Sequence, residues 1–110
     1  MKLINKIKGF LQFRTSKKEI TYEEAIEIIK KYPETKLVDV RSIQEYNENH
    51  LKGAISIPIY DIKEITKIIK NRDNIIILYC QTGARSRKAE KVLSDLCYTN
   101  IYTIKRGLNG

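Results

Sequence analysis

The sequence predicts an α/β domain in which a doubly wound parallel sheet of about four to five strands carries helices on both faces. Short apolar runs rich in β-branched residues occur at residues 37–40, 54–57, 75–79 and 101–104 and show no helical period, which is typical of buried strands. Segments with helical periodicity separate these runs. Strands that alternate with helices imply βαβ units, and therefore a parallel sheet covered on both sides.

The first helix is expected to open with a capping box, because Thr21 is followed three residues later by Glu24. The apolar residues of this helix are Ala25, Ile26, Ile28 and Ile29. Tyr32 and Pro33 end the helix, since proline disfavours helical backbone in the residue before it. The strand at residues 37–40 comes next.

A second capping box, Ser42 with Glu45, predicts a brief helix after that strand. A turn at Gly53 then leads into the strand at residues 54–57. Pro58 closes this strand, because proline lacks the N–H group that a sheet needs.

Two further helices complete the pattern. Asp61 is expected to cap a third helix, which residues 71–74 interrupt. Its periodic apolar positions are Ile62, Ile65, Ile68 and Ile69. Ser86 is expected to cap the last helix, which ends near Leu96. The apolar positions of this last helix include Ala89, Val92 and Leu93.

Cys80 stands where the strand at residues 75–79 runs into a short loop and then a helix. Ligands of parallel α/β sheets bind beyond the carboxyl ends of the strands. Free N–H groups and the positive end of a helix dipole favour an anion there, and Arg85 adds a full positive charge. Because such surroundings can lower a cysteine pKa from about 8.5 to roughly 3.5–7.5, we predict that Cys80 is a thiolate nucleophile at neutral pH.

Composition indicates one globular domain. The chain has 110 residues, of which 42% are hydrophobic and 31% charged. No apolar run reaches the ~20 residues of a transmembrane helix. Two cysteines do not make a disulfide framework, so a reducing, cytoplasmic location is expected.

The net charge of +8 is concentrated at the N-terminus. Residues 1–18 form a basic arm with six cations and no acid, whereas the domain, residues 19–110, carries 15 cations against 13 anions. The domain shows no basic stripe with interleaved aromatic residues. No nucleic-acid partner is therefore expected.

Two interpretations of the basic arm stay open. Leu3, Ile4, Ile7 and Leu11 share one helical face, which would allow weak, peripheral contact with an anionic membrane. Gly9 weakens such a helix. The favoured alternative is an arm that docks its few apolar residues on the domain or frays in solvent.

These residues resemble the single-domain rhodaneses, or thiosulfate sulfurtransferase-like proteins, over residues 19–110. Four segments carry the resemblance: residues 37–41 with Glu45 and Tyr46; residues 50–54 with Ile57 and Pro58; residues 79–86; and residues 98–102 with 107–110. Any one of these motifs is weak evidence. Four in the same order and spacing make the match specific.

The resemblance implies a sulfurtransferase without metal or organic cofactor. Cys80 would attack a small sulfur-containing anion such as thiosulfate, become a persulfide, and pass the sulfur to cyanide, a thiol or a protein acceptor. The substrate-binding loop would consist of Gln81, Thr82, Gly83, Ala84, Arg85 and Ser86. Its amides would cradle the terminal sulfur, as an oxyanion hole does, and Arg85 would attract the donor.

Two other functions are alternatives to a sulfurtransferase. A cysteine phosphatase or arsenate reductase also places cysteine and arginine around an anion-binding loop, but its arginine follows the cysteine by six positions. Here Arg85 comes one position earlier, and a shorter loop suits a single sulfur atom better than a phosphate. A non-catalytic rhodanese-like binding module usually lacks the cysteine that this chain keeps.

The remaining polar residues of the resemblance are interpreted as structural support. Asp39, Arg41 and Glu45 are expected to form a hydrogen-bonded ion pair that braces the edge of the sheet near the cysteine loop, and His50 to make a local hydrogen bond. Cys97 stands where the family usually has a glycine that suits a left-handed helix end. It is expected to be buried rather than to act as a resolving thiol for Cys80.

Two positions depart from the family pattern. Asn49 replaces a glycine, which is tolerable because asparagine accepts positive φ. Arg106 replaces the first glycine of the usual pair near the end of the chain.

Overall fold

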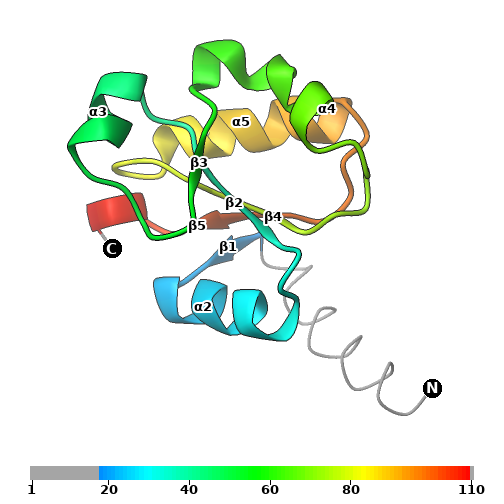
Figure 1. Cartoon of the computed structure of the whole chain (residues 1–110), viewed down its shortest axis with the longest axis horizontal. Coiled ribbons are helices and arrows are strands. Elements are labelled where there is room, and N and C mark those ends of the chain that lie inside the picture. Colours follow the sequence, from blue (N-terminus) through cyan, green and yellow to red (C-terminus); the bar gives the residue numbers. More distant parts are fainter. Residues whose placement is uncertain (1–17, 110) are drawn as a thin grey trace.

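The computed structural model describes residues 18–109, and its five strands form one parallel sheet (Figure 1). The strands are β1 (Glu19–Ile20), β2 (Lys36–Asp39), β3 (Ile55–Ser56), β4 (Ile76–Tyr79) and β5 (Ile101–Ile104). Their order across the sheet is β1-β5-β4-β2-β3, and every pairing is parallel. The predicted fold class is therefore confirmed.

Helical elements cover both faces of this sheet (Figure 1). They are α2 (Tyr22–Lys31), α3 (Ile43–Glu48), η1 (Ile59–Glu64), α4 (Ile65–Ile68), α5 (Ala84–Asp95) and η2 (Gly107–Asn109). In Figure 1, α2 lies below the sheet, whereas η1, α4 and α5 lie above it. The chain leaves β2 toward one edge of the sheet and leaves β4 toward the other. The crevice beyond the carboxyl ends of β2 and β4 is thus a topological switch point, where ligands of such sheets bind.

Alternate residues of β4 supply the two halves of the core. Ile76 and Leu78 pack on the side of α5 and η1, together with Cys80 at the end of the strand. Ile77 and Tyr79 pack on the side of α2. Because all four residues of β4 are buried, the strand reads as a continuous apolar run, as expected for a central parallel strand.

Both predicted capping boxes are present. The Thr21 side chain accepts a hydrogen bond from the Glu24 N–H at the start of α2, and the Glu24 carboxylate accepts one from the Thr21 N–H. Ser42 and Glu45 make the same reciprocal pair at α3. The helix boundary at Tyr32 is also confirmed, since this residue is the C-cap of α2.

The third helix differs from its prediction. It is two pieces, a 3-10 helix η1 that follows Pro58 and a single α-turn α4. Asp61 does not cap it: this residue lies inside η1 with non-helical φ and ψ. Ile62, Ile65 and Ile69 are buried, whereas Ile68 is exposed. The kink at Asp61 lies within η1 itself, and periodicity alone does not reveal it.

Cys97 is exposed, so its predicted burial is wrong. It lies just past the end of α5 with φ of 73°. The Cys97 N–H donates to the Ser94 carbonyl at 3.0 Å, and the Tyr98 N–H donates to the Leu93 carbonyl at 3.1 Å. These two bonds are those of a Schellman motif, in which Cys97 takes the left-handed position and turns its side chain to solvent while Tyr98 packs into the core.

Asn49 does not use the ability of asparagine to adopt a positive φ. This residue has φ of −168° and is the C-cap of α3 in extended backbone, which any residue adopts. Arg106, by contrast, has φ of 63°. A left-handed non-glycine residue costs roughly 1–2 kcal/mol, so the backbone there is held by its surroundings.

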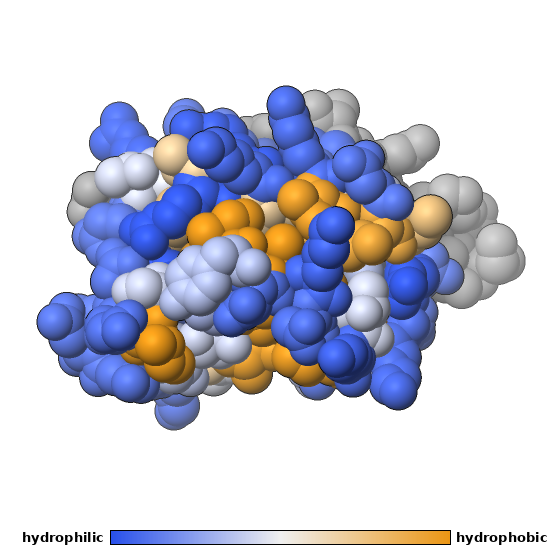
Figure 2. Space-filling model, turned by 90° about the horizontal axis from the view of Figure 1, so that it is seen from above, coloured by the Kyte–Doolittle hydropathy of each residue, from blue (hydrophilic) through white to orange (hydrophobic). Residues whose placement is uncertain are grey.

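The predictions made for residues 1–17 fall outside the described residues, so membrane contact by the basic arm stays a prediction. Among residues 18–109, no helix is long and apolar enough to cross a membrane. Figure 2 looks onto the face that carries η1 and α4, where apolar side chains reach the surface among charged ones. Tyr60 and Ile68 are the large apolar side chains of these two elements that are exposed.

Candidate active site

Cys80 directly follows β4 and faces the N-terminus of α5. Its thiol is buried, with 1% of the residue exposed. The Gly83 N–H donates to Cys80 Sγ at 3.0 Å, and Ser86 Oγ lies 3.7 Å from the sulfur. The loop therefore wraps around the sulfur atom, as the sequence pattern predicts.

The helix after this loop begins earlier than expected. Its N-cap is Gly83, with φ of 105°, and not Ser86. Ser86 is buried in the first turn. While Cys80 is a thiol, the Ser86 hydroxyl donates to the Gly83 carbonyl at 3.0 Å, and once the thiol ionises the hydroxyl can turn its proton to the sulfur 3.7 Å away. Since glycine adopts a left-handed conformation without strain, the chain can turn from Cys80 into α5 within three residues. The free N–H groups of the first turn then lie close to the sulfur.

Other members of the predicted loop form its rim. Thr82 and Ala84 are exposed, and Gln81 and Arg85 are half-buried. A side chain at Gly83 would be strained by the backbone φ of 105°, and an added Cβ would also displace the Arg87 guanidinium, which would stand 2.9 Å from it. The loop thus offers backbone N–H groups, rather than reactive side chains, to the sulfur.

The surroundings of Cys80 favour the thiolate. Burial alone would raise the pKa of Cys80, but hydrogen bonds from the Ser86 N–H and hydroxyl and from the N–H groups of Gly83 and Thr82 outweigh it and lower the pKa. A thiol whose pKa lies below the ordinary value is nucleophilic without a general base.

This arrangement predicts which side chain controls the ionisation of Cys80. We expect Ser86→Ala to move the midpoint of the pH profile of Cys80 alkylation by iodoacetamide to higher pH, because the variant loses one hydrogen-bond donor to the thiolate. Arg85→Ala should move the midpoint less. Both midpoints follow from alkylation rates read by mass spectrometry in a Cys97→Ser background. An equal or larger shift in Arg85→Ala would assign the thiolate to the arginine instead.

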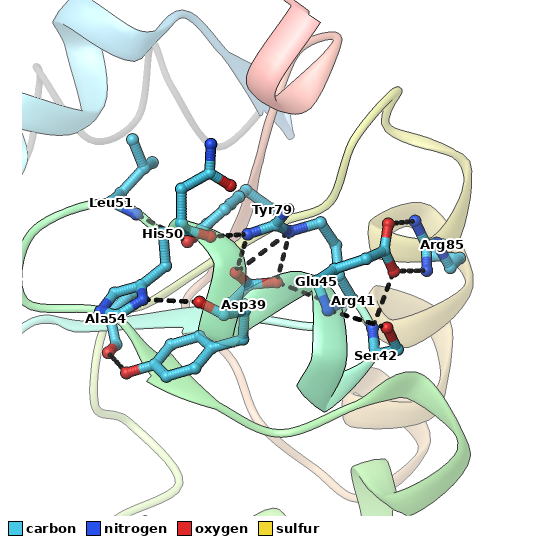
Figure 3. A network of polar contacts seen from close by, with 11 residues as sticks. Asp39, Arg41, Ser42, Glu45, His50, Leu51, Ala54, Tyr79 and Arg85 are labelled. Carbon is cyan, nitrogen blue, oxygen red and sulfur yellow. Dashed lines mark hydrogen bonds and ion pairs between the residues drawn. The ribbon is translucent and has the colours of Figure 1, made fainter.

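Arg85 is held by Glu45 across the crevice between β2 and β4. The guanidinium donates to both carboxylate oxygens of Glu45, at 2.8 and 3.1 Å (Figure 3). Hydrogen bonds from Arg85 and from Ser42 lower the pKa of Glu45 to about 2. Glu45 is therefore ionised at neutral pH and neutralises Arg85. The prediction that Glu45 joins Asp39 and Arg41 in one ion pair is wrong. Glu45 instead connects α3 to the cysteine loop through Arg85.

Asp39 and Arg41 form a separate, buried pair (Figure 3). Arg41 donates through Nε to Asp39 Oδ1 at 3.0 Å and through Nη2 to Oδ2 at 2.7 Å, and Nη2 also donates to the Asn49 carbonyl at 2.6 Å. The side chains are 0% and 3% exposed, respectively. The pair thus fixes the segment after β2 to the end of α3, next to the cysteine loop.

His50 makes the expected kind of local contact. Its Nδ1 lies 2.9 Å from the Tyr46 carbonyl, and its ring stacks on that of Tyr46 at 3.8 Å between centroids. The Tyr46 hydroxyl donates to the Ala54 carbonyl at 2.7 Å. These contacts fasten the turn after α3 beside the carboxyl end of the sheet.

Gly107 and Leu108, which were predicted only as part of a family motif, also contact the site. The Leu108 N–H donates to the Cys80 carbonyl at 2.9 Å. Gly107 has φ of 55°, and a Cβ added to it would stand 1.8 Å from the Cys80 carbonyl oxygen. Only glycine fits there. The pairing of a strand end with a distant glycine leaves no local signal in the sequence.

Among residues 18–109, no cluster of histidine, cysteine or acidic side chains could hold a metal ion. Cys80 and the N–H groups around it form the centre of the site. This fold and this loop define an α/β domain that holds a single buried cysteine among backbone N–H groups at the carboxyl edge of a parallel sheet.

The chain belongs to the family of rhodanese-like domains. The family model matches residues 21–110, which include the whole sheet except β1. The resemblance inferred from the four motifs is thereby confirmed.

The relatives of this chain include a sulfurtransferase and a hydroxylase. It is 34% identical to thiosulfate sulfurtransferase PspE of Escherichia coli over 58% of this chain and 62% of the relative. It is 37% identical to a tRNA uridine(34) hydroxylase of Buchnera aphidicola over 66% of this chain. The chain spans less than two thirds of the length of these relatives, and only 25% of the hydroxylase.

Solved structures support the same fold. A rhodanese-related protein from Thermoplasma volcanium is 31% identical, with a TM-score of 0.70 over 83% of this chain and 86% of that protein. A rhodanese with anions from E. coli is 30% identical, with a TM-score of 0.60 over 66% of this chain and 85% of that protein.

Proposed function

We propose that this protein is a sulfurtransferase that carries sulfane sulfur as a persulfide on Cys80. The observation that carries the proposal is the 3.0 Å hydrogen bond from the Gly83 N–H to Cys80 Sγ, at the N-terminus of a 12-residue helix. Such a cradle stabilises a thiolate, and it can stabilise the terminal sulfur anion of a persulfide in the same way.

With thiosulfate as donor, the reaction has two displacement steps. The Cys80 thiolate attacks the outer sulfur of thiosulfate, a sulfur–sulfur bond forms, and the donor's sulfur–sulfur bond breaks with its electron pair leaving on sulfite. Cyanide then attacks the terminal sulfur of the persulfide. Thiocyanate forms and the Cys80 thiolate is regenerated, so no external oxidant or reductant is needed.

The site and one relative support this choice of donor and acceptor classes. A small sulfur-containing anion suits a cradle of N–H groups, and one relative is named a thiosulfate sulfurtransferase. The acceptor would be cyanide, a thiol or the thiol of a partner protein. A reducing compartment, such as the cytoplasm, would keep both free cysteines as thiols.

Intact-mass measurement tests this function directly. After incubation with thiosulfate, we expect the protein to gain the mass of one sulfur atom, and peptide mapping should place that sulfur on Cys80. Added cyanide should remove it and release an equal amount of thiocyanate. An unchanged mass, together with hydrolysis of an aryl phosphate, would support a cysteine phosphatase instead.

A further inference from the structure

Most cations near the cysteine loop are already bound by carboxylates. Arg41 is buried against Asp39, and Arg85 is paired with both oxygens of Glu45. Arg87, which follows the loop on α5, lies 3.1 Å from Glu19. These guanidinium groups have little charge left for an incoming anion, because each faces a carboxylate at contact distance.

Arg106 differs from these three arginines. It is exposed and has no carboxylate partner among the described residues. Its backbone nitrogen would lie 3.5 Å from a Cβ added at Gly83, so it contacts the cysteine loop. The next residue, Gly107, is packed against the Cys80 carbonyl. The backbone of Arg106 is therefore fixed beside the cysteine loop, and its exposed guanidinium has no carboxylate partner among the described residues.

A cleft of about 440 Å³ adjoins this position. Its lining includes Arg106 and Gly107, a second cation, Lys105, and one carboxylate, Glu23. The two cations are neighbours in the chain, whereas Glu23 comes from α2. The surface beside Gly107 therefore carries an excess of positive charge next to an open cleft, although Cys80 itself does not line that cleft.

We propose that Arg106 determines specificity for anionic sulfur donors by binding the group that leaves, the sulfite portion of thiosulfate, while the loop amides hold the transferred sulfur. This inference rests on the proposed sulfurtransferase function and concerns the first displacement only. Sulfite leaves with the electron pair of the broken sulfur–sulfur bond and carries two negative charges, so a cation beside the leaving group attracts the donor before the bond breaks and stabilises sulfite afterwards. The persulfide that remains bears one negative charge in the cradle and no longer needs Arg106.

Charge-matched variants separate this role from a structural one. Arg106→Gln removes the charge and keeps the left-handed residue a non-glycine, whereas Arg106→Lys keeps the charge. Lys36→Gln removes one exposed cation at the amino end of β2, at the opposite edge of the sheet, and is the matched control. All variants are made in the full chain.

Each half of the reaction is then measured. With thiosulfate, we expect Arg106→Gln to lower kcat/KM about tenfold, chiefly through KM, and to weaken the salt dependence of kcat/KM. Arg106→Lys should stay within about threefold of the unchanged protein, and Lys36→Gln should equal it. For protein loaded with persulfide beforehand, sulfide release by dithiothreitol, a neutral acceptor, should proceed at the same rate in Arg106→Gln.

Three outcomes would count against this role. If Arg106→Gln keeps both the kcat/KM and the salt dependence of the unchanged protein, Arg106 does not bind the donor. If both halves of the reaction slow equally, the substitution has distorted the cradle. If Lys36→Gln lowers kcat/KM as much, overall charge and not Arg106 attracts the donor. Failure of the proposed function is separate from all three, because the unchanged protein would then form no persulfide.

Discussion

Replacement of Cys80 by serine should reduce sulfur transfer to the uncatalysed background. A serine hydroxyl is not ionised at neutral pH, so the hydrogen bonds that lower the pKa of the Cys80 thiol would have no anion to stabilise. An alcohol also cannot store a sulfane sulfur. We expect neither a mass increase with thiosulfate nor thiocyanate formation from Cys80→Ser.

The second cysteine provides the matched control. Cys97 is exposed and follows the far end of α5, a 12-residue helix that spans roughly 18 Å. Cys97→Ser should therefore keep the full activity. Transfer by a folded Cys80→Ser protein, or loss of transfer in Cys97→Ser alone, would contradict the assignment of the persulfide to Cys80.

Replacement of Asp39 by alanine should lower the free energy of unfolding by about 3–5 kcal/mol. The substitution leaves the Arg41 guanidinium buried without its carboxylate, and a buried charge without a partner is costly. For a domain of this size, such a loss lowers Tm by more than about 10 °C. Chemical denaturation followed by circular dichroism measures it.

A double variant shows whether this loss comes from the stranded charge. Asp39→Leu combined with Arg41→Met removes both charges and fills a similar volume, so it should be less destabilised than Asp39→Ala alone. The Asn49 carbonyl would still lose its hydrogen bond, so stability should not return fully. If the double variant is less stable than Asp39→Ala, loss of the contacts of the Asp39 carboxylate destabilises the protein more than the unpaired charge of Arg41 does.

Local signals account for the parts of the fold that the sequence predicted well. The capping boxes at Thr21 and Ser42 involve residues only three positions apart, so they are readable without the fold. The strand at residues 101–104 is an isolated run of β-branched and aromatic residues, and its bounds are those of β5. Strand β1, by contrast, has two residues and exists only because β5 offers it an edge.

The sequence predicted the position of Cys80 in the candidate site, but not the contacts between distant residues around it. Cys80 could be placed because a strand, a loop and a helix follow one another in sequence. Glu45 and Arg85 are 40 residues apart, and their pairing depends on α3 and α5 meeting across the switch point. The helix start at Gly83 was missed because serine is the commoner cap, whereas here the tight turn around the sulfur needs positive φ.

The pairing of the first strand with the last has a consequence for how the chain folds. Glu19 and Ile20 are in register with Thr103 and Ile104, and the Lys105 N–H donates to the Ile20 carbonyl at 2.7 Å. This edge of the sheet cannot form during synthesis until almost the whole domain has left the ribosome. Non-local parallel pairing of this kind slows folding.

β1 and β4 must therefore wait for β5, which is synthesised last of the three. The four residues of β4 are buried in the finished sheet, and until β5 arrives one edge of this apolar strand stays open. We expect the nascent domain to fold in one late step, once residues 101–104 can reach both β4 and β1.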